Sequence, residues 1–185
     1  RLEQADGGQQ TGGLNTPPAG YDGLSINRST LSDTGMFALE VYRQNGPDYQ
    51  SEAAIADLRT GAVQILTGTP VNGDDDRSPK SSNGGGYVAL QAGPDRGQLQ
   101  PYLYSSAAGW LPLGNLTAGG DGRPLGVNAA GTVVGRTGNS TGQTVPFIYT
   151  DSGGMQPITD NGTAVFGQAV AISNTGLVTG TGNGR

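Results

Sequence analysis

Short apolar runs, broken by frequent glycine and proline, form the pattern of this 185-residue chain. Apolar runs reach four residues at most, as in 53–56. No window of 11 or more residues carries apolar positions at helical spacing without an interrupting Gly or Pro. Two aromatic pairs, Tyr102/Tyr104 and Phe147/Tyr149, instead alternate as side chains on one face of a strand do. The pattern predicts an all-β protein with almost no helix.

A nine-residue block recurs four times along the chain. In each copy a polar step and a glycine precede β-branched, aromatic or aliphatic residues. This is the composition of a tight turn with a positive-φ position that leads into a strand, so the block predicts a hairpin. The copies cover 31–39, 82–90, 127–135 and 172–180, and their glycines Gly35, Gly86, Gly131 and Gly176 are spaced by 51, 45 and 45 residues.

A second block follows each of the first three copies and keeps nearly the same period. It joins two short strand-like runs through a glycine turn, which predicts a second hairpin. Two hairpins in about 47 residues make a four-stranded antiparallel unit, so the expected fold is a β-propeller-like array of repeats of about 45–50 residues. A β-sandwich or β-solenoid is the alternative, because repeats alone do not fix how sheets pack. The copies cover 53–66, 100–113 and 145–158.

The repeats define a predicted domain organisation. We expect a flexible or strand-donating arm over 1–23 and a single repeat-built domain over 24–185. Three full units and an opening hairpin would leave a strand edge uncovered. A longer polypeptide, the arm of the same molecule or the arm of another molecule could each cover that edge. The expected units are 24–70, 71–117 and 118–163, with a partial unit over 164–185.

The two blocks resemble the HAF repeats of bacterial extracellular proteins. In that family a stretch Ile-Asn-Asn-x-Gly-x-Val-Val-Gly is followed by His-Ala-Phe-Leu-Trp. Residues 127–135 and 172–180 match the first part, and 145–149 occupies the place of the second without its histidine. The resemblance is good over about 100–185, weaker over 24–99 and absent from the first 20 residues. It implies a secreted or surface-displayed, propeller-like repeat protein, and it brings no catalytic residues.

Composition removes several kinds of chemistry. The chain has no His and no Cys, which excludes a Ser-His-Asp relay, an ordinary zinc site and any disulfide. Its net charge of −5 disfavours nucleic acid, and its apolar runs are far too short for a membrane-spanning helix. We therefore predict a non-enzymatic protein without a cofactor. The carboxylates weighed for a glycosidase pair are Asp33, Glu40, Asp57, Asp121 and Asp151, several of which fit turn chemistry better.

Two candidate ligand sites remain. Asp74, Asp75 and Asp76 could supply oxygen ligands to Ca²⁺, but consecutive residues do not converge as alternating ligands do, so a surface turn is the main interpretation. Trp110 is the candidate for an exposed ring that stacks on a glycan, because its repeat counterparts are not aromatic. The paired aromatic residues are expected to form core between units, with a ligand platform as the alternative.

These observations lead to a functional prediction. The first residue is Arg1 rather than Met, and the composition is acidic and rich in Gly, Thr and Asn, so we expect an extracellular or cell-surface setting. The favoured function is a structural or self-assembling protein, a filament or coat subunit whose partner is itself or another surface component. Assembly would exchange a strand through four apolar residues near the start of the chain, Leu14, Tyr21, Leu24 and Ile26. A glycan- or surface-ligand-binding module is the alternative.

Overall fold

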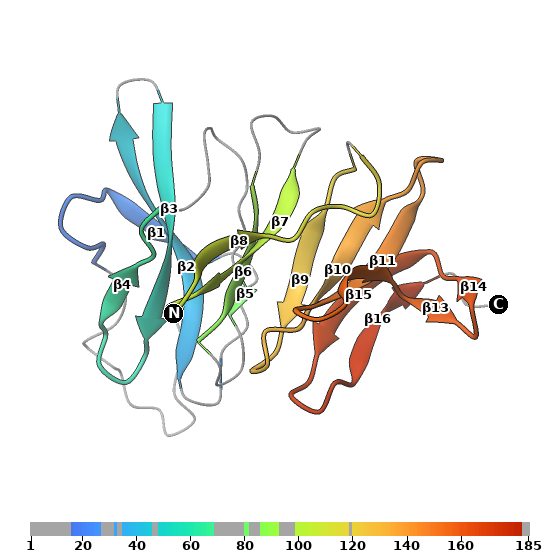
Figure 1. Cartoon of the computed structure of the whole chain (residues 1–185). Helices are drawn as coiled ribbons and strands as arrows, with labels where there is room; N and C mark the ends of the chain where they lie inside the picture. The colour runs from blue at the N-terminus through green and yellow to red at the C-terminus, as the bar shows by residue number, and fades with distance from the viewer. Residues whose placement is uncertain are drawn as a thin grey trace.

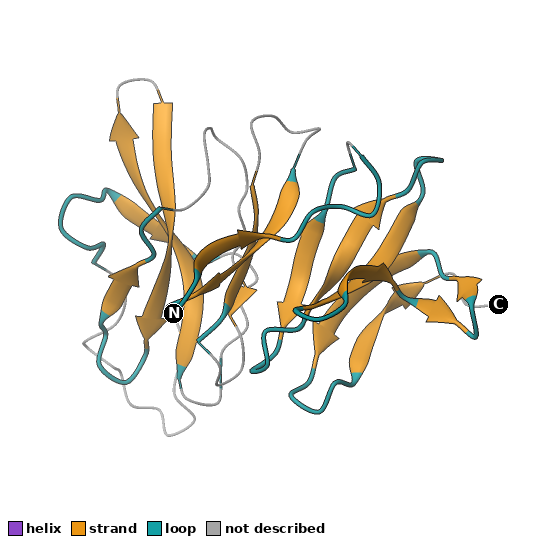
Figure 2. Ribbon diagram, in the orientation of Figure 1, coloured by secondary structure: helices purple, strands orange, loops and turns teal. Residues whose placement is uncertain are grey.

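A computed structural model describes residues 16–26, 32, 35–45, 48–68, 80–81, 86–92, 99–118 and 120–182. All regular elements in these residues are β-strands, and no helix occurs among them (Figure 2). This confirms the all-β prediction. In the same residues, accordingly, no helix has the length and apolar character needed to cross a membrane.

Three four-stranded sheets form most of the molecule (Figure 1). In each sheet the strands follow one another in chain order and every neighbouring pair is antiparallel, which confirms the predicted four-stranded antiparallel units. The first sheet contains β1 (Gly23–Ser25), β2 (Met36–Asn45), β3 (Asp48–Asp57) and β4 (Val63–Ile65). The second contains β5 (Lys80–Ser81), β6 (Val88–Ala92), β7 (Gln100–Ser105) and β8 (Gly109–Pro112). The third contains β9 (Arg123–Val127), β10 (Val133–Gly138), β11 (Thr144–Thr150) and β12 (Gly154–Pro157).

Two hairpins follow the third sheet. The small hairpin of β13 (Thr159–Asp160) and β14 (Thr163–Ala164) was not foreseen from the sequence. The last hairpin, β15 (Gly167–Ile172) and β16 (Val178–Gly182), corresponds to the fourth copy of the first repeated block. Its position in the repeat is that of β9 and β10, the first two strands of the third sheet. The division of the chain into an arm and four units stays a prediction.

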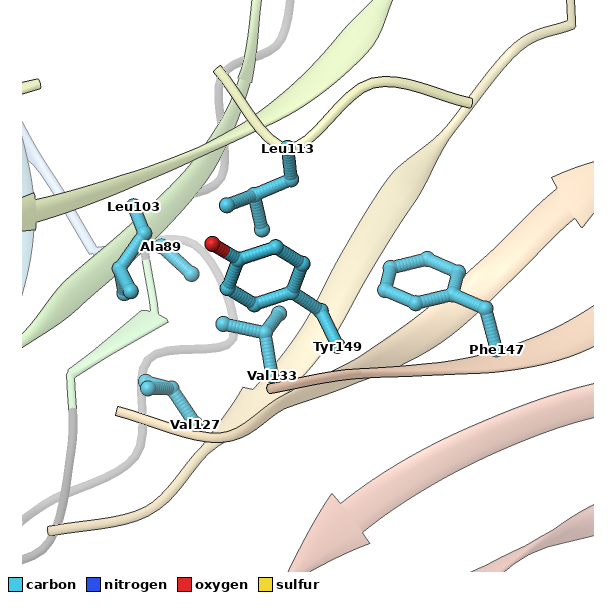
Figure 3. Packing of buried hydrophobic residues seen from close by; sticks show 7 residues of the cluster. All are labelled: Ala89, Leu103, Leu113, Val127, Val133, Phe147 and Tyr149. Atoms are coloured by element: carbon cyan, nitrogen blue, oxygen red, sulfur yellow. The ribbon is translucent and has the colours of Figure 1, made fainter. Parts of the chain in front are cut away.

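The consecutive sheets pack face to face through apolar side chains. Between the first and second sheets, Ala38 and Ala53 meet Val88 and Leu90, with Tyr102, Tyr104 and Trp110 beside them. Between the second and third sheets, the core consists of the residues drawn in Figure 3: Ala89, Leu103, Leu113, Val127, Val133, Phe147 and Tyr149. The alternating aromatic residues thus face the preceding sheet, and their prediction as core between units is confirmed.

The face of the first sheet that points away from the second sheet is also closed. Phe37, Leu39 and Val41 of β2 form a cluster there with alanines of β3. Leu39 and Val41 are fully buried, although the described residues form no further sheet on that side. Tyr21 and Leu24 pack against this cluster. The first sheet therefore has both faces covered within one molecule.

Candidate functional site

The repeated turns position the last hairpin, and their geometry explains the first block. In the turn between β9 and β10, Asn128 donates its N–H to the carbonyl of Thr132, and its side-chain Oδ1 accepts from the N–H of Thr132 at 3.0 Å. Ser32 and Ser173 make the equivalent pair of contacts. Each donates its N–H to the carbonyl of the residue four positions later and accepts the N–H of that residue with its hydroxyl oxygen. The glycine of each described turn has a positive φ, between 69° and 86°. The predicted turn chemistry is therefore confirmed.

Hydrogen bonds between turns hold the last hairpin against the third sheet. Asn128 donates from Nδ2 to the carbonyl of Ser173 at 3.3 Å, and the N–H of Ala129 donates to Oδ1 of Asn174 at 2.9 Å. Each contact joins residues 45 positions apart, the repeat period. The polar residue Asn128 thus has two roles. It closes the turn between β9 and β10, and it connects that turn to the turn between β15 and β16. Sequence reasoning identified only the first role.

Close backbone packing adds to this attachment. β15 contacts β9, β10 and β11 of the third sheet. A Cβ atom at Gly126 of β9 would lie 3.1 Å from the Cα of Ala171, so the close approach of β15 favours a glycine there. Ala169 of β15 is buried in the same contact region of the hairpin. One face of the last hairpin is therefore fixed on the third sheet.

The other strand of this hairpin has an open edge. In the third sheet β10 pairs with both β9 and β11, whereas its counterpart β16 pairs only with β15 among the described residues. Residues 179–182 are exposed, and Leu177 in the adjoining turn is 69% exposed. Alternate backbone groups of an edge strand point away from its partner and are free to form hydrogen bonds.

The outer face of the same hairpin is polar. The second-to-last position of the first block faces the following sheet, and it is occupied by Ala38, Ala89 and Val134, all buried. The fourth unit has Thr179 there, and this threonine is exposed. The outer face of the last hairpin can therefore remain in contact with water. The edge of β16 differs, because its backbone groups favour pairing with another strand.

The other edge strands are less able to pair with an added strand. β1, β4 and β5 are at most three residues long, while β8 and β12 end in Pro112 and Pro157. β9 carries Arg123 and Pro124, and the pairing of β15 is interrupted by a bulge at Val170. Short strands, prolines, charges and bulges all limit edge-to-edge pairing. β16, Val178–Gly182, has five residues and none of these features.

Trp110, the predicted glycan platform, lies on β8 and is half-buried. Its ring packs against Tyr104 with 5.0 Å between ring centroids, and both rings border the core between the first and second sheets. The indole Nε1 is buried and has no hydrogen-bond partner among the described residues. Most of this ring is therefore engaged in packing.

The predicted calcium residues Asp74, Asp75 and Asp76 lie outside the described residues, as does Asp33. Among the residues that are described, no three carboxylates gather into a group that could hold a metal ion. Asp57 accepts hydrogen bonds from the N–H and guanidinium of Arg59, and these bonds lower the pKa of its carboxyl group. The other weighed carboxylates belong to different parts of the fold: Glu40 to the first sheet, and Asp121 and Asp151 to exposed connections of the third.

The three predicted assembly residues that the structure describes have different surroundings. Leu14 lies outside the described residues, and Ile26 is exposed after β1. Tyr21 and Leu24 pack against the first sheet of their own molecule, where Leu24 stands opposite Val41 in the β1–β2 pair. The described part of the arm, 16–22, is therefore tied to the start of the domain and not to β16.

Polar contacts reinforce this attachment. Asp22 donates its N–H to the carbonyl of Tyr42 at 2.9 Å, and its carboxylate accepts the N–H of Gln44 at 2.6 Å. The guanidinium of Arg43 lies 5.9 Å from the centre of the Tyr21 ring. Burial raises the pKa of the Tyr21 phenol, and the nearby carboxylate of Glu52 raises it further. Pulling this segment away would break all these contacts.

Comparisons with known proteins do not assign the chain to a family. No protein-family model matches the chain, and a search of curated protein sequences found no significant match. The resemblance to HAF repeats therefore stays a prediction from the motifs.

Proposed function

We propose that the chain is a non-enzymatic structural module that associates with itself by adding a strand at the open edge of β16. The observation that carries this proposal is the edge of β16, which has the place of β10 and, among the described residues, no partner equivalent to β11. An open edge offers backbone hydrogen bonds to an incoming strand, which is a recurring mode of protein association.

The finer architecture that we propose is propeller-like. Its support is the face-to-face packing of successive antiparallel meanders, each displaced along the chain by one repeat. Propeller blades are four-stranded units of about this length.

We further propose an extracellular or cell-surface location, in keeping with the motifs shared with HAF repeats. The acidic chain has a net charge of −5, which suits a protein that does not bind nucleic acid. Its partners would be other copies of itself or surface components. No cofactor is needed for this role, and calcium at Asp74–Asp76 stays the alternative for that acidic segment.

Sedimentation velocity over a wide range of protein concentration tests the proposal. Self-association predicts a species larger than one chain that dissociates on dilution. The competing hypothesis, a glycan-binding module, predicts a monomer that is retained on a glycan array and loses retention in Trp110→Ala. A monomer at every concentration contradicts self-association.

A further inference from the structure

We propose that Arg123 and Arg136 bind a tetrahedral oxyanion, a sulfate or phosphate group, on the face of the third sheet that the last hairpin covers. The proposal does not depend on strand addition at β16. It rests on two half-buried guanidinium groups and on the strands around them, all of which belong to the described part of the chain.

The two arginines stand directly opposite each other on neighbouring strands. Arg123 of β9 is the Cα partner of Arg136 of β10 in an antiparallel pair, so both side chains leave the same face of the sheet. Side chains alternate along β10, so Arg136 shares the face of Val134. That face is turned toward β15, because a Cβ atom at Gly126, the partner of Val134, would lie 3.1 Å from the Cα of Ala171 (Figure 1).

The strands around the pair supply no opposite charge. None of β9, β10, β11, β15 and β16 contains Asp or Glu. On its other side Arg136 stands opposite Pro146 of β11, whose side chain offers no acceptor. Arg136 forms no ion pair with the described residues, whereas Arg59 pairs with the carboxylate of Asp57 at 3.1 Å. Like charges directly opposed are destabilising, so an anion between the two strands would stabilise this arrangement.

Arg136 carries more of the proposal than its neighbour does. Arg123 has a further interaction within the molecule, and its charge is therefore not available to a ligand alone. The guanidinium of Arg136 has five N–H donors and only a positive neighbour and a proline across the sheet. A partly buried charge of this kind favours an acceptor from outside the chain.

The nearby part of the last hairpin leaves room for a small group. β15 lies along β9 at an offset of 45 residues, as the hydrogen bond from Asn128 to Ser173 shows. The same offset places the start of β15 beside Arg123. Gly167 at that start pairs with Gly182 of β16, so neither strand contributes a side chain there.

The chemistry of the pair selects the class of ligand. A guanidinium presents its donors in a planar fork that matches two oxygens of a sulfate, phosphate or carboxylate group. Two opposed guanidinium groups carry two positive charges, which a doubly charged tetrahedral oxyanion balances better than a single carboxylate does. A free ion and an ester on a surface polysaccharide present the same group to the pair.

NMR titration with sodium sulfate, at an ionic strength kept constant with sodium chloride, tests the site. We expect saturable shifts of amide signals in β9 and β10, because the chloride reference removes the effect of screening. Arg136→Gln should weaken the affinity for sulfate at least about tenfold, since a bidentate, charge-assisted contact is lost. Arg136→Lys keeps the charge without the planar fork, so its affinity should lie between the two.

The matched control is Arg59→Gln, because this arginine already has a carboxylate partner. It should bind sulfate as the native chain does. Circular dichroism should show that each variant is folded. At low ionic strength without sulfate, Arg136→Gln should have a urea midpoint no lower than that of the native chain, because it removes one of two opposed like charges.

A sulfated oligosaccharide and its desulfated counterpart distinguish the sources of the group. Tighter binding of the sulfated sugar than of inorganic sulfate, with no binding of the desulfated one, would assign the group to a polymer. Equal affinity for the sulfated sugar and the ion would assign a free ion. Absence of saturable shifts in the native chain, or equal affinity in the native chain and Arg136→Gln, would overturn the site. Either result would leave self-association at β16 untouched.

Discussion

Asn128 offers a direct test of the role given to the repeated turn. It is 4% exposed, and Oδ1 accepts from the N–H groups of Ala130 and Thr132 at 3.0 Å each. Its Nδ2 donates to Ser173 at 3.3 Å. Asn128→Ala removes all three part-buried contacts, and a typical hydrogen bond contributes about 0.5–1.5 kcal/mol net. We expect the free energy of unfolding to fall by about 2 kcal/mol.

Asn128→Ser is the matched variant, because Ser32 and Ser173 perform the same turn contact in other units. The hydroxyl can still accept from Thr132, so mainly the hydrogen bond to Ser173 is lost. The expected loss is about 1 kcal/mol or less, the net value of one neutral hydrogen bond. Urea unfolding followed by circular dichroism and by the fluorescence of Trp110, the sole tryptophan, measures both variants. Equal losses in the alanine and serine variants would refute the assigned turn role.

Three further predictions concern the core, a close contact and pH. Phe147→Ala should cost about 3–5 kcal/mol in urea unfolding because the ring is fully buried, whereas Leu177→Ala at an exposed site should change stability by less than about 0.5 kcal/mol; similar values would contradict the packing. Gly135→Ala should destabilise strongly and lower the urea midpoint, because its Cβ would collide with a backbone carbonyl of β9. The pKa of Asp57, measured by NMR titration, should lie below its ordinary value and return toward it in Arg59→Ala. Since folding lowers this pKa, its contribution to stability is present above the unfolded pKa near 4 and is lost as the pH falls through the folded value.

Local chemistry made the turns and hairpins predictable. A polar residue followed three positions later by glycine specifies the turn, and the described copies of it carry a positive φ at that glycine. Alternation within Phe147-Ile-Tyr149 likewise indicated which side chains share a face, and the aromatic pair is buried as expected. Both features depend on residues a few positions apart, which is the distance over which a single sequence is informative.

Features that depend on packing between units were not predictable. The second role of Asn128 depends on a partner one repeat away, and the half-burial of Trp110 depends on how the first two sheets face each other. The arm residues Tyr21 and Leu24 are apolar wherever they pack, so the sequence alone does not distinguish a donated strand from a segment attached to its own first sheet. Only the arrangement of the sheets resolves these cases.

Hydrogen exchange at protein concentrations above and below the midpoint of self-association tests strand addition at β16 most directly. Strand addition predicts that backbone amides within Val178–Gly182 exchange more slowly at high concentration, because the incoming strand accepts their hydrogen bonds. Amides of the proline-ended edge strand β12, Gly154–Pro157, should exchange at the same rate at both concentrations. Concentration-dependent protection that falls elsewhere, with none in β16, would contradict the account.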